Sequence, residues 1–422
     1  MKLPKIFKIR QNLPRPKLDN PISKVAEELE KLNLKEKLNN EKVIAITGGS
    51  RGIANIDLIY KEIASFIKEK GGKPIIISAM GSHGGGTPEG QREVLAHLGV
   101  TEDKIGCPVI ASSEVEVLGK TPTHGIPVYC AKEAIAADGI IVVNRVKAHT
   151  AFRAPRESGL LKMLGIGLGR APGADAIHSR GTDEIGDIIL ELSRVVREKV
   201  SVIAGLAIVE NGYEETAVIE GLYPEDFEEG EARLLKYAKE LMPSVPFDEL
   251  DLLIVNEMGK NYSGTGMDTN VIGRWRIHGV EEPERPNFKR IAVLDLTDAS
   301  HGNANGIGLA DFTTKRLFEK VNFKSTYLNC LTTGFTLRGM IPIVLNSDKE
   351  VIETSLKTLY LEKPEKAKIA WIKNTLFLDK MYCSESLLPF VEANPNLEIV
   401  EGLMDFPFDG ENNLIRENLG NG

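Results

Sequence analysis

The sequence predicts an α/β protein with two α/β domains, each built on a largely parallel sheet. Apolar runs of strand length alternate with segments of helical spacing, which is the pattern of strands joined by helical crossovers. At 422 residues the chain is too long for one ordinary core. A proline-bounded stretch at 243–246 separates two such alternating series. We therefore expect an N-terminal domain over 1–248 and a C-terminal domain over 249–422.

Each predicted element of the first domain has a local signal. The apolar run at 42–47 ends at a glycine turn, and Gly71-Gly72 stops the helical spacing that begins at Ile56. Thr87 is a predicted N-cap, with Pro88 as the first helical residue. In order, we predict strand 42–47, helix 56–70, strand 73–79, a helix from residue 88, and strand 139–144.

The second series begins after a charged helical segment at 225–241 and the proline-bounded linker. Its apolar runs have the length and composition of buried strands. In order, we predict strand 250–257, strand 290–296, helix 313–321 and strand 367–373. The sequence leaves open whether the last segment returns to the first domain.

Composition excludes several classes of protein. A net charge of −8 argues against nucleic-acid binding, which usually selects a basic patch. The four cysteines form no C-x-x-C pair, so neither a disulfide framework nor a thiolate zinc site is predicted. No apolar run reaches the length of a membrane helix, and the basic N-terminus lacks the apolar core of a signal peptide. We expect a cytoplasmic protein.

Two glycine-rich stretches resemble nucleotide-binding turns. The segment 47–53 (TGGSRGI) follows a strand, as in short-chain dehydrogenases, but no tyrosine has the lysine four residues on that this family uses. In the segment 165–169 (GIGLG), Arg170 occupies the third glycine position of the dinucleotide fingerprint. An NAD(P)-dependent oxidoreductase therefore stays as an alternative rather than the leading interpretation.

Histidine and lysine side chains gather in glycine-rich segments that follow predicted strands. His83 lies within 81–86 (GSHGGG), His149 within 147–149 (KAH), and Lys162 ends 158–162 (SGLLK), with His178 downstream. Each alone has a plain structural explanation, such as a loop histidine or a solvated lysine. Together they offer imidazoles and an amine for proton transfer or metal binding, at the strand ends where α/β folds place ligands.

These residues resemble the nickel-dependent lactate racemase family. In that family a lysine in a Ser-Gly-x-x-Lys segment carries a nickel-pincer nucleotide, and a histidine sixteen residues later binds the nickel. Lys162 and His178 have this spacing. The resemblance implies that Lys162 binds the cofactor (nickel pyridinium-3,5-bisthiocarboxylic acid mononucleotide) and that His178 is the metal ligand.

The resemblance also assigns catalytic and substrate-binding residues. His83 and His149 match the two catalytic histidines, and Arg51 matches the arginine that binds the substrate carboxylate. Glu257 and Lys260 match a Gln-x-x-Lys pair that opens the second domain, with glutamate in the glutamine's place. The implied active site lies in a cleft between the domains.

The implied activity is a racemase or epimerase of a 2-hydroxy acid, acting by reversible proton-coupled hydride transfer to the lysine-tethered cofactor. The implied partners are the small 2-hydroxy acid and the enzymes that make the cofactor, and a homo-oligomer is compatible with the sequence. A non-catalytic protein that binds a hydroxy acid or a metal is a further alternative. The polar segment 298–306 is either a site for substrate hydroxyls or a plain turn.

Overall fold

The computed structural model describes residues 1–178 and 184–419. The chain divides into two compact units, the first formed by Arg15–Met242 and the second by Met1–Pro14 together with Pro243–Gly422. The division at Met242 and Pro243 lies a few residues before the boundary predicted at 248. Residues 1–14 belong to the second unit, although the sequence analysis assigned them to the first domain.

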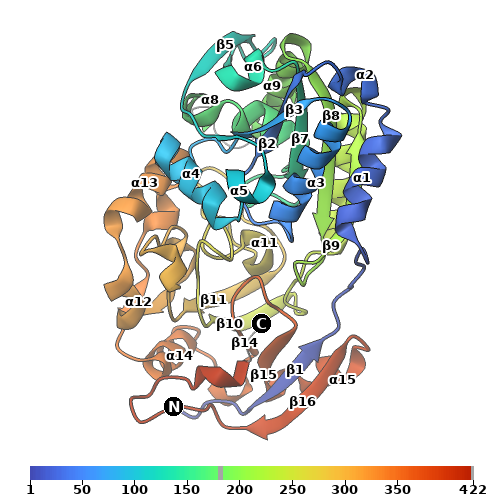
Figure 1. Ribbon diagram of the computed structural model, residues 1–422. Coiled ribbons are helices and arrows are strands. Elements are labelled where there is room, and N and C mark those ends of the chain that lie inside the picture. Colours follow the sequence, from blue (N-terminus) through green and yellow to red (C-terminus); the bar gives the residue numbers. More distant parts are fainter. Residues whose placement is uncertain (179–183, 420–422) are drawn as a thin grey trace. The chain divides into compact units, whose positions relative to one another are not determined.

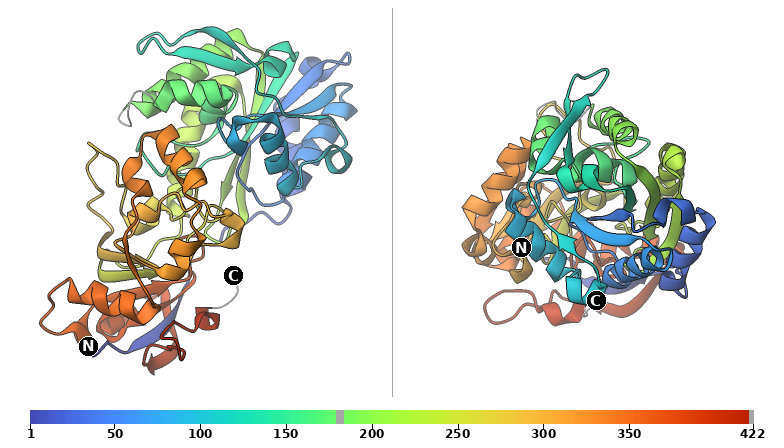
Figure 2. Two further views of the ribbon diagram at one scale, coloured as in Figure 1. Left: turned by 90° about the vertical axis from the view of Figure 1, so that its left-hand side faces the viewer. Right: turned by 45° about the horizontal axis from the view of Figure 1, so that its top comes forward.

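The first unit contains a six-stranded sheet in the order β4-β3-β2-β7-β8-β9, in which only the pair β8–β9 is antiparallel. A separate hairpin, β5–β6, stands apart from this sheet (Figure 2). The strands are β2 Val43–Gly48, β3 Lys73–Ser78, β4 Val109–Ile110, β5 Val115–Lys120, β6 Pro127–Ala131, β7 Gly139–Arg145, β8 Val202–Glu210 and β9 Thr216–Leu222.

Helices cover both faces of this sheet (Figure 1). Successive strand side chains alternate between the faces, so Ile44 and Ile46 pack with α1, α3 and α4, while Ala45 packs with α9 and α10. The helices of the first unit are α1 Pro21–Lys31, α2 Lys35–Leu38, α3 Ile56–Glu69, α4 Pro88–His97, α5 Glu102–Ile105, α6 Lys132–Ala136, α7 Leu160–Lys162, α8 Arg170–His178, α9 Ile185–Lys199 and α10 Phe227–Glu240.

Strand order determines where this unit is suited to bind a ligand. The chain runs from β2 outward to β3 and β4, then crosses back to β7 and β8 on the other side of β2. The loops after β2 and β7 therefore diverge at their carboxyl ends, and such a switch point is where open α/β sheets usually bind ligands. These two loops carry Arg51 and His149.

The second unit contains an eight-stranded sheet in the order β13-β12-β11-β10-β14-β15-β1-β16. The pairs from β13 to β14 are parallel, and the remaining three pairs are antiparallel. The N-terminal strand β1 lies between β15 and β16 (Figure 1). The strands are β1 Ile6–Gln11, β10 Glu249–Val255, β11 Asn287–Val293, β12 Phe312–Thr314, β13 Ile343–Leu345, β14 Ile369–Ile372, β15 Lys380–Ser384 and β16 Leu397–Met404.

This sheet repeats the switch-point topology. The chain runs from β10 to β11, β12 and β13, then crosses back to β14 on the other side of β10. The helices of the second unit are α11 Thr269–Ile272, α12 Lys315–Lys320, α13 Phe323–Thr333, α14 Asp348–Lys357 and α15 Leu388–Ala393. Both units are α/β with parallel sheets at their centres, so the predicted fold class is confirmed.

The elements differ from the prediction mainly at their ends. The expected helix 313–321 is wrong at its start, because Phe312–Thr314 forms strand β12 and the helix begins at Lys315. Thr314 ends the strand and caps the helix, its hydroxyl accepting a hydrogen bond from Leu317 N at 3.1 Å. The predicted N-cap at Thr87 is confirmed, since Thr87 Oγ1 accepts from Gly90 N at 3.1 Å.

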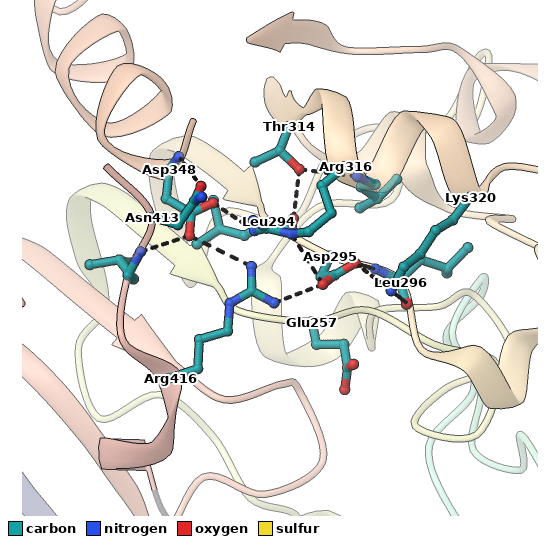
Figure 3. A network of polar contacts seen from close by, with 12 residues as sticks. Glu257, Leu294, Asp295, Leu296, Thr314, Arg316, Lys320, Asp348, Asn413 and Arg416 are labelled. Carbon is teal, nitrogen blue, oxygen red and sulfur yellow. Dashed lines mark hydrogen bonds and ion pairs between the residues drawn. The ribbon is translucent and has the colours of Figure 1, made fainter. Parts of the chain in front are cut away.

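A buried ionic network ties the C-terminal segment to the second sheet (Figure 3). Asp295 accepts hydrogen bonds or ion pairs from Arg316 at 3.2 Å, Lys320 at 2.9 Å and Arg416 at 2.8 Å. Asp348, which is fully buried, bonds to Arg316 at 2.8 Å. Because buried charges are costly unless paired, this network makes the segment that carries Arg416 part of the folded unit.

Replacing Arg416 by alanine is expected to lower the free energy of unfolding by about 2 kcal/mol. The substitution removes one cation from the two buried carboxylates, which keep their ion pairs with the other cations of the network. Urea unfolding of Arg416→Ala beside Lys366→Ala, an exposed lysine of the same unit, measures this. Equal stability of the two variants would show that the network does not anchor the C-terminal segment.

None of the helices in the described ranges is both long enough and apolar enough to cross a membrane. All four cysteines are buried and free, as the absence of a disulfide framework in the sequence predicts.

Candidate functional site

Arg51 and His83 lie on neighbouring loops, after β2 and β3. The Arg51 guanidinium lies 3.3 Å from Nε2 of His83, and Ser50 Oγ lies 3.1 Å from Nδ1. Nδ1 is also 2.7 Å from the carbonyl oxygen of Met80, which only accepts hydrogen bonds. The proton of the neutral ring therefore sits on Nδ1, and the Nε2 lone pair faces the guanidinium.

The glycine loop around His83 is held against helix α4. Gly84 has a φ of +65°, and a Cβ there would lie 2.5 Å from the backbone of Gly90, so the close approach requires glycine. The buried Gln91 amide donates from Nε2 to the carbonyl oxygens of Gly81 at 3.1 Å and His83 at 3.4 Å. Loop and helix thus fix the position of His83.

His149 lies in the loop after β7 and is positioned by the buried Glu157. The Glu157 carboxylate accepts from His149 N at 2.7 Å and from the Lys239 ammonium at 2.7 Å. Ala151 N donates to Nδ1 of His149 at 3.2 Å, which places the proton of this neutral ring on Nε2. The Phe152 ring packs beside the imidazole at a centroid distance of 4.3 Å.

The loop after β7 also holds the segment that leads to Lys162. Asn144 Nδ2 donates to Gly159 O at 2.8 Å, and Lys147 N donates to Ser158 O at 3.0 Å. Both contacts join the end of β7 to the start of α7. His149 and the Ser-Gly-x-x-Lys segment therefore share one connected loop structure.

Lys162 is the last residue of α7, and a π-helical turn, η2, follows at Met163–Gly167. Such turns are frequent at functional sites. A Cβ at Gly167 would lie 2.7 Å from the carbonyl oxygen of Ala79, and Gly81 N donates to Gly167 O at 3.3 Å. The turn after Lys162 therefore packs directly against the loop that carries His83.

The electrostatic surroundings of Lys162 favour its neutral amine. Burial, together with the positive charges of Arg51 and Lys147, lowers the pKa of Lys162 to about 8, and Glu231 opposes this. A larger share of this side chain is therefore an unprotonated nucleophile at neutral pH than for an ordinary lysine. The structure places Arg51, His83, Lys162 and the His149 loop at one edge of the first sheet.

Glu231, on α10, is a site residue that the sequence analysis missed. Its buried carboxylate accepts from Leu161 N at 3.0 Å, at the start of α7, and burial raises its pKa to about 7. A Cβ on Gly159 would lie 2.5 Å from this carboxylate, which explains the glycine of the motif. The sequence holds a signal, because Glu231 shares a helix face with the buried Phe227 and Leu235.

Glu210 and Arg145 were also missed. Glu210 ends strand β8, accepts from Ala54 N at 2.6 Å in the Arg51 loop, and pairs with Arg145 at the end of β7. Arg145 also lies 3.9 Å from Glu214. These contacts connect the loops on either side of the switch point and fix the backbone near Arg51.

His178 ends helix α8, but its side chain lies outside the described part of the molecule. Within residues 1–178 and 184–419, no three histidine, cysteine, aspartate or glutamate side chains gather as a metal site. The family resemblance assigns a single protein imidazole to the nickel, so it does not require such a cluster. The role of His178 stays a prediction.

Glu257 and Lys260 lie in the second unit, in the loop after β10. Lys260 Nζ donates to Gly264 O at 2.6 Å and to Asn329 Oδ1 at 2.9 Å, and Glu257 accepts from the Tyr262 hydroxyl at 2.7 Å. The inter-domain cleft stays a prediction.

The polar segment 298–306 mainly builds the loop around Lys260. Ser300 Oγ accepts from Lys260 N at 2.9 Å, Asn303 donates to Asn329 at 2.9 Å, and Asn305 donates to Gly264 O at 3.3 Å. These contacts favour the turn over a site for substrate hydroxyls.

The structure of the segment 165–169 does not support the dehydrogenase alternative. The segment 165–169 begins inside the π-helical turn, whereas a dinucleotide fingerprint requires a strand-to-helix turn. After β2, helix α3 begins only at Ile56, eight residues beyond the strand. Neither of the two glycine segments, 47–53 and 165–169, therefore forms the tight strand-to-helix turn of a dinucleotide fingerprint.

A substitution of Lys162 has a testable effect on stability. The folded-state pKa of about 8 lies below the ordinary value of 10.5, so protonation of Lys162 opposes folding at pH 7. This cost disappears as the pH rises from 8 to 10.5. Lys162→Met is therefore expected to raise the free energy of unfolding by about 3 kcal/mol at pH 7, and by nearly nothing at pH 10.5.

Chemical denaturation at the two pH values measures this change, and Lys236→Met, an exposed lysine of the same unit, is the control. A Lys162→Met protein that is less stable than the control at pH 7 would refute the electrostatic account of this amine.

Comparisons with known proteins concern the family and the fold. Residues 52–222 match a family model described as a domain of unknown function, DUF362. The matched range includes His83, His149 and Lys162, and it ends with strand β9. No curated protein matches the chain.

Two solved structures resemble the chain. A crystal structure of a Thermotoga maritima protein, a structural-genomics target, aligns with a TM-score of 0.50 at 16% identity, over 78% of this chain and 84% of that one. The lactate racemase apoprotein from Thermoanaerobacterium thermosaccharolyticum aligns with a TM-score of 0.48 at 14% identity, over 92% of both chains. The Thermotoga likeness shows the α/β fold alone.

Proposed function

We propose that this chain is an isomerase that interconverts the stereoisomers of a 2-hydroxy acid, with a nickel-pincer nucleotide attached to Lys162. The observation that carries the proposal is the amine of Lys162 at the carboxyl edge of the first sheet. It has a pKa of about 8 and shares this edge with Arg51 and the loops of two histidines. The sequence resemblance supplies the identity of the cofactor.

The residues of the edge suit a covalently held anionic cofactor. Attachment through a thioamide requires an unprotonated amine, and the low pKa of Lys162 favours it. The product of that attachment is uncharged, so it relieves the cost of a cation beside Arg51 and Lys147. The positive charges that remain, on Arg51 and Lys147, attract the phosphate of the nucleotide and the carboxylate of a substrate.

The two histidines are suited to hold and pass on one proton. His83 presents an unprotonated Nε2 that can accept a proton, whereas neutral His149 presents an Nε2–H that donates a hydrogen bond, and each ring acts as an acid only after it has taken up a second proton. In the proposed reaction one imidazole takes the hydroxyl proton of the substrate and later returns it. The bound cofactor supplies a reversible acceptor for the substrate's α-hydrogen as hydride.

Arg51 is the proposed anchor of the substrate carboxylate in the first unit. Its forked guanidinium matches a carboxylate, and its contact with His83 brings that carboxylate next to the imidazole. Lys260 is the proposed second cation for the carboxylate.

The experiment that tests this function follows one enantiomer of each of a panel of 2-hydroxy acids in deuterated water, with protein co-expressed with the cofactor-synthesis enzymes. The expected result is conversion to the other isomer without deuterium at the α-carbon, because the hydride is returned internally. Deuterium incorporation would replace hydride transfer with a proton-abstraction mechanism. Net oxidation that depends on NAD(P) would support the dehydrogenase alternative, and absence of any conversion would support a binding protein.

A further inference from the structure

The second unit has a polar cluster at its own switch point, between β10 and β14. Asn256 follows β10 directly, and its N–H donates to Ile372 O at the end of β14 at 2.9 Å. Asn256 is only 8% exposed, and its Oδ1 has no hydrogen-bond partner among the described residues. A buried polar atom without a partner is costly, which makes this oxygen a candidate ligand contact.

The next residue, Glu257, is held in one orientation by Tyr262. The Tyr262 hydroxyl donates to Glu257 Oε2 at 2.7 Å. Burial, and then Glu257 itself, raise the pKa of Tyr262 to about 12, so the hydroxyl keeps its proton and remains a donor. Among the described residues, no hydrogen bond to Glu257 Oε1 is found, and Glu257 is partly exposed.

Asn374, at the end of β14, supports this arrangement. Its Oδ1 accepts from Leu376 N at 2.9 Å and from Phe377 N at 2.8 Å, and its side chain also faces the Tyr262 hydroxyl. Asn374 is fully buried, so the orientation of Tyr262 is set by the fold. Asn374 Nδ2 is a buried donor that also lacks a hydrogen-bond partner among the described residues, and it belongs to the side chain that faces Tyr262. The two acceptors left for a ligand are Asn256 Oδ1 and Glu257 Oε1.

Two acceptors require donors on the ligand, and the carboxylate among them repels a second carboxylate. Uncharged hydroxyl groups meet both conditions. Lys260, three residues further along, is a cation bonded to the neutral acceptors Gly264 O and Asn329 Oδ1, which suits the acid group of such a molecule. We propose that Asn256, Glu257 and Tyr262 recognise the hydroxyl groups of a polyhydroxylated 2-hydroxy acid, an aldonic acid.

This inference rests on the proposed function for the class of substrate, and it adds specificity for hydroxyls beyond the α-carbon. A site built to bond hydroxyl groups discriminates strongly against an analogue that lacks them, because its buried acceptors then stay unpaired. Because hydrogen bonds to a charged acceptor are stronger than those between neutral groups, the expected preference is at least about tenfold in Kd.

Calorimetric titration of the cofactor-free chain tests the proposal with two six-carbon ligands, gluconate and 2-hydroxyhexanoate. Gluconate is expected to bind at least about tenfold more tightly. Glu257→Gln, which exchanges an acceptor for a donor, is expected to remove this preference. Tyr262→Phe is expected to weaken it, and Tyr360→Phe, which changes a 93% exposed tyrosine of the same unit, is expected to retain it.

Equal binding of the two ligands, or an unchanged preference in folded Glu257→Gln protein, would overturn the inference. Tighter binding of 6-aminohexanoate than of gluconate would also overturn it, in favour of an amine site. These titrations need no cofactor, so their outcome is independent of whether the proposed nickel chemistry is correct. If Lys162 were found to be unmodified, the proposed nickel chemistry would be ruled out, but the expected preference for gluconate would not change.

Discussion

Replacing Lys162 by arginine is expected to abolish isomerase activity and the retention of nickel together. Arginine keeps the positive charge and a similar length, but its guanidinium stays protonated at neutral pH and forms no thioamide link. Lys236→Arg is the matched control, because Lys236 is an exposed lysine on α10 of the same unit. Nickel content by elemental analysis and turnover of a 2-hydroxy acid are the two measurements.

Activity and nickel content are informative only as a pair. Lys162→Arg protein that retains nickel and turns over substrate would show that the cofactor is not attached at this residue. If the Lys236→Arg control also lost activity and nickel, the cause would be faulty loading of the cofactor rather than the loss of the Lys162 amine.

The histidine variants are expected to separate catalysis from cofactor binding. Asparagine retains the bond that each ring makes with the backbone: its amide NH₂ replaces the Nδ1 donor of His83 to Met80 O, and its oxygen replaces the Nδ1 acceptor of His149. Only the Nε2 position is lost. His83→Asn and His149→Asn are each expected to reduce kcat by roughly 10²–10⁴-fold while nickel content is unchanged.

His97→Asn is the control, since His97 is exposed at the end of α4 in the same unit. If either active-site variant interconverts the isomers at the normal rate, that histidine is not the acid or base. If nickel is lost with the activity, the histidine contributes to cofactor binding instead.

Local sequence patterns predicted the parallel core of both units well. Strands such as β2 and β7 are continuous apolar runs bounded by turn residues, and α3 has helical spacing that ends at a glycine pair. Strand β1 was missed because its partners in β15 and β16 lie at least 370 residues away in the chain. No local pattern specifies a pairing at that separation, and residues 1–14, which the sequence analysis placed in the first domain, group with the second unit.

Site residues that lie within a sequence motif could be predicted, whereas residues that reach the site only through tertiary packing could not. Lys162 and His83 stand out because glycines surround them in the sequence. The residues that adjust the pKa of Lys162 come from three separate segments, and only the fold brings Arg51, Lys147 and Glu231 around it. Glu231 is one of several acids on a charged helix, and its burial depends on its contact with α7.

Peptide mass mapping after co-expression with the cofactor-synthesis enzymes tests the central claim most directly. We expect the peptide containing Lys162 to carry the mass of the nucleotide and the protein to hold about one nickel per chain. A fully active protein in which that peptide has its unmodified mass would contradict it.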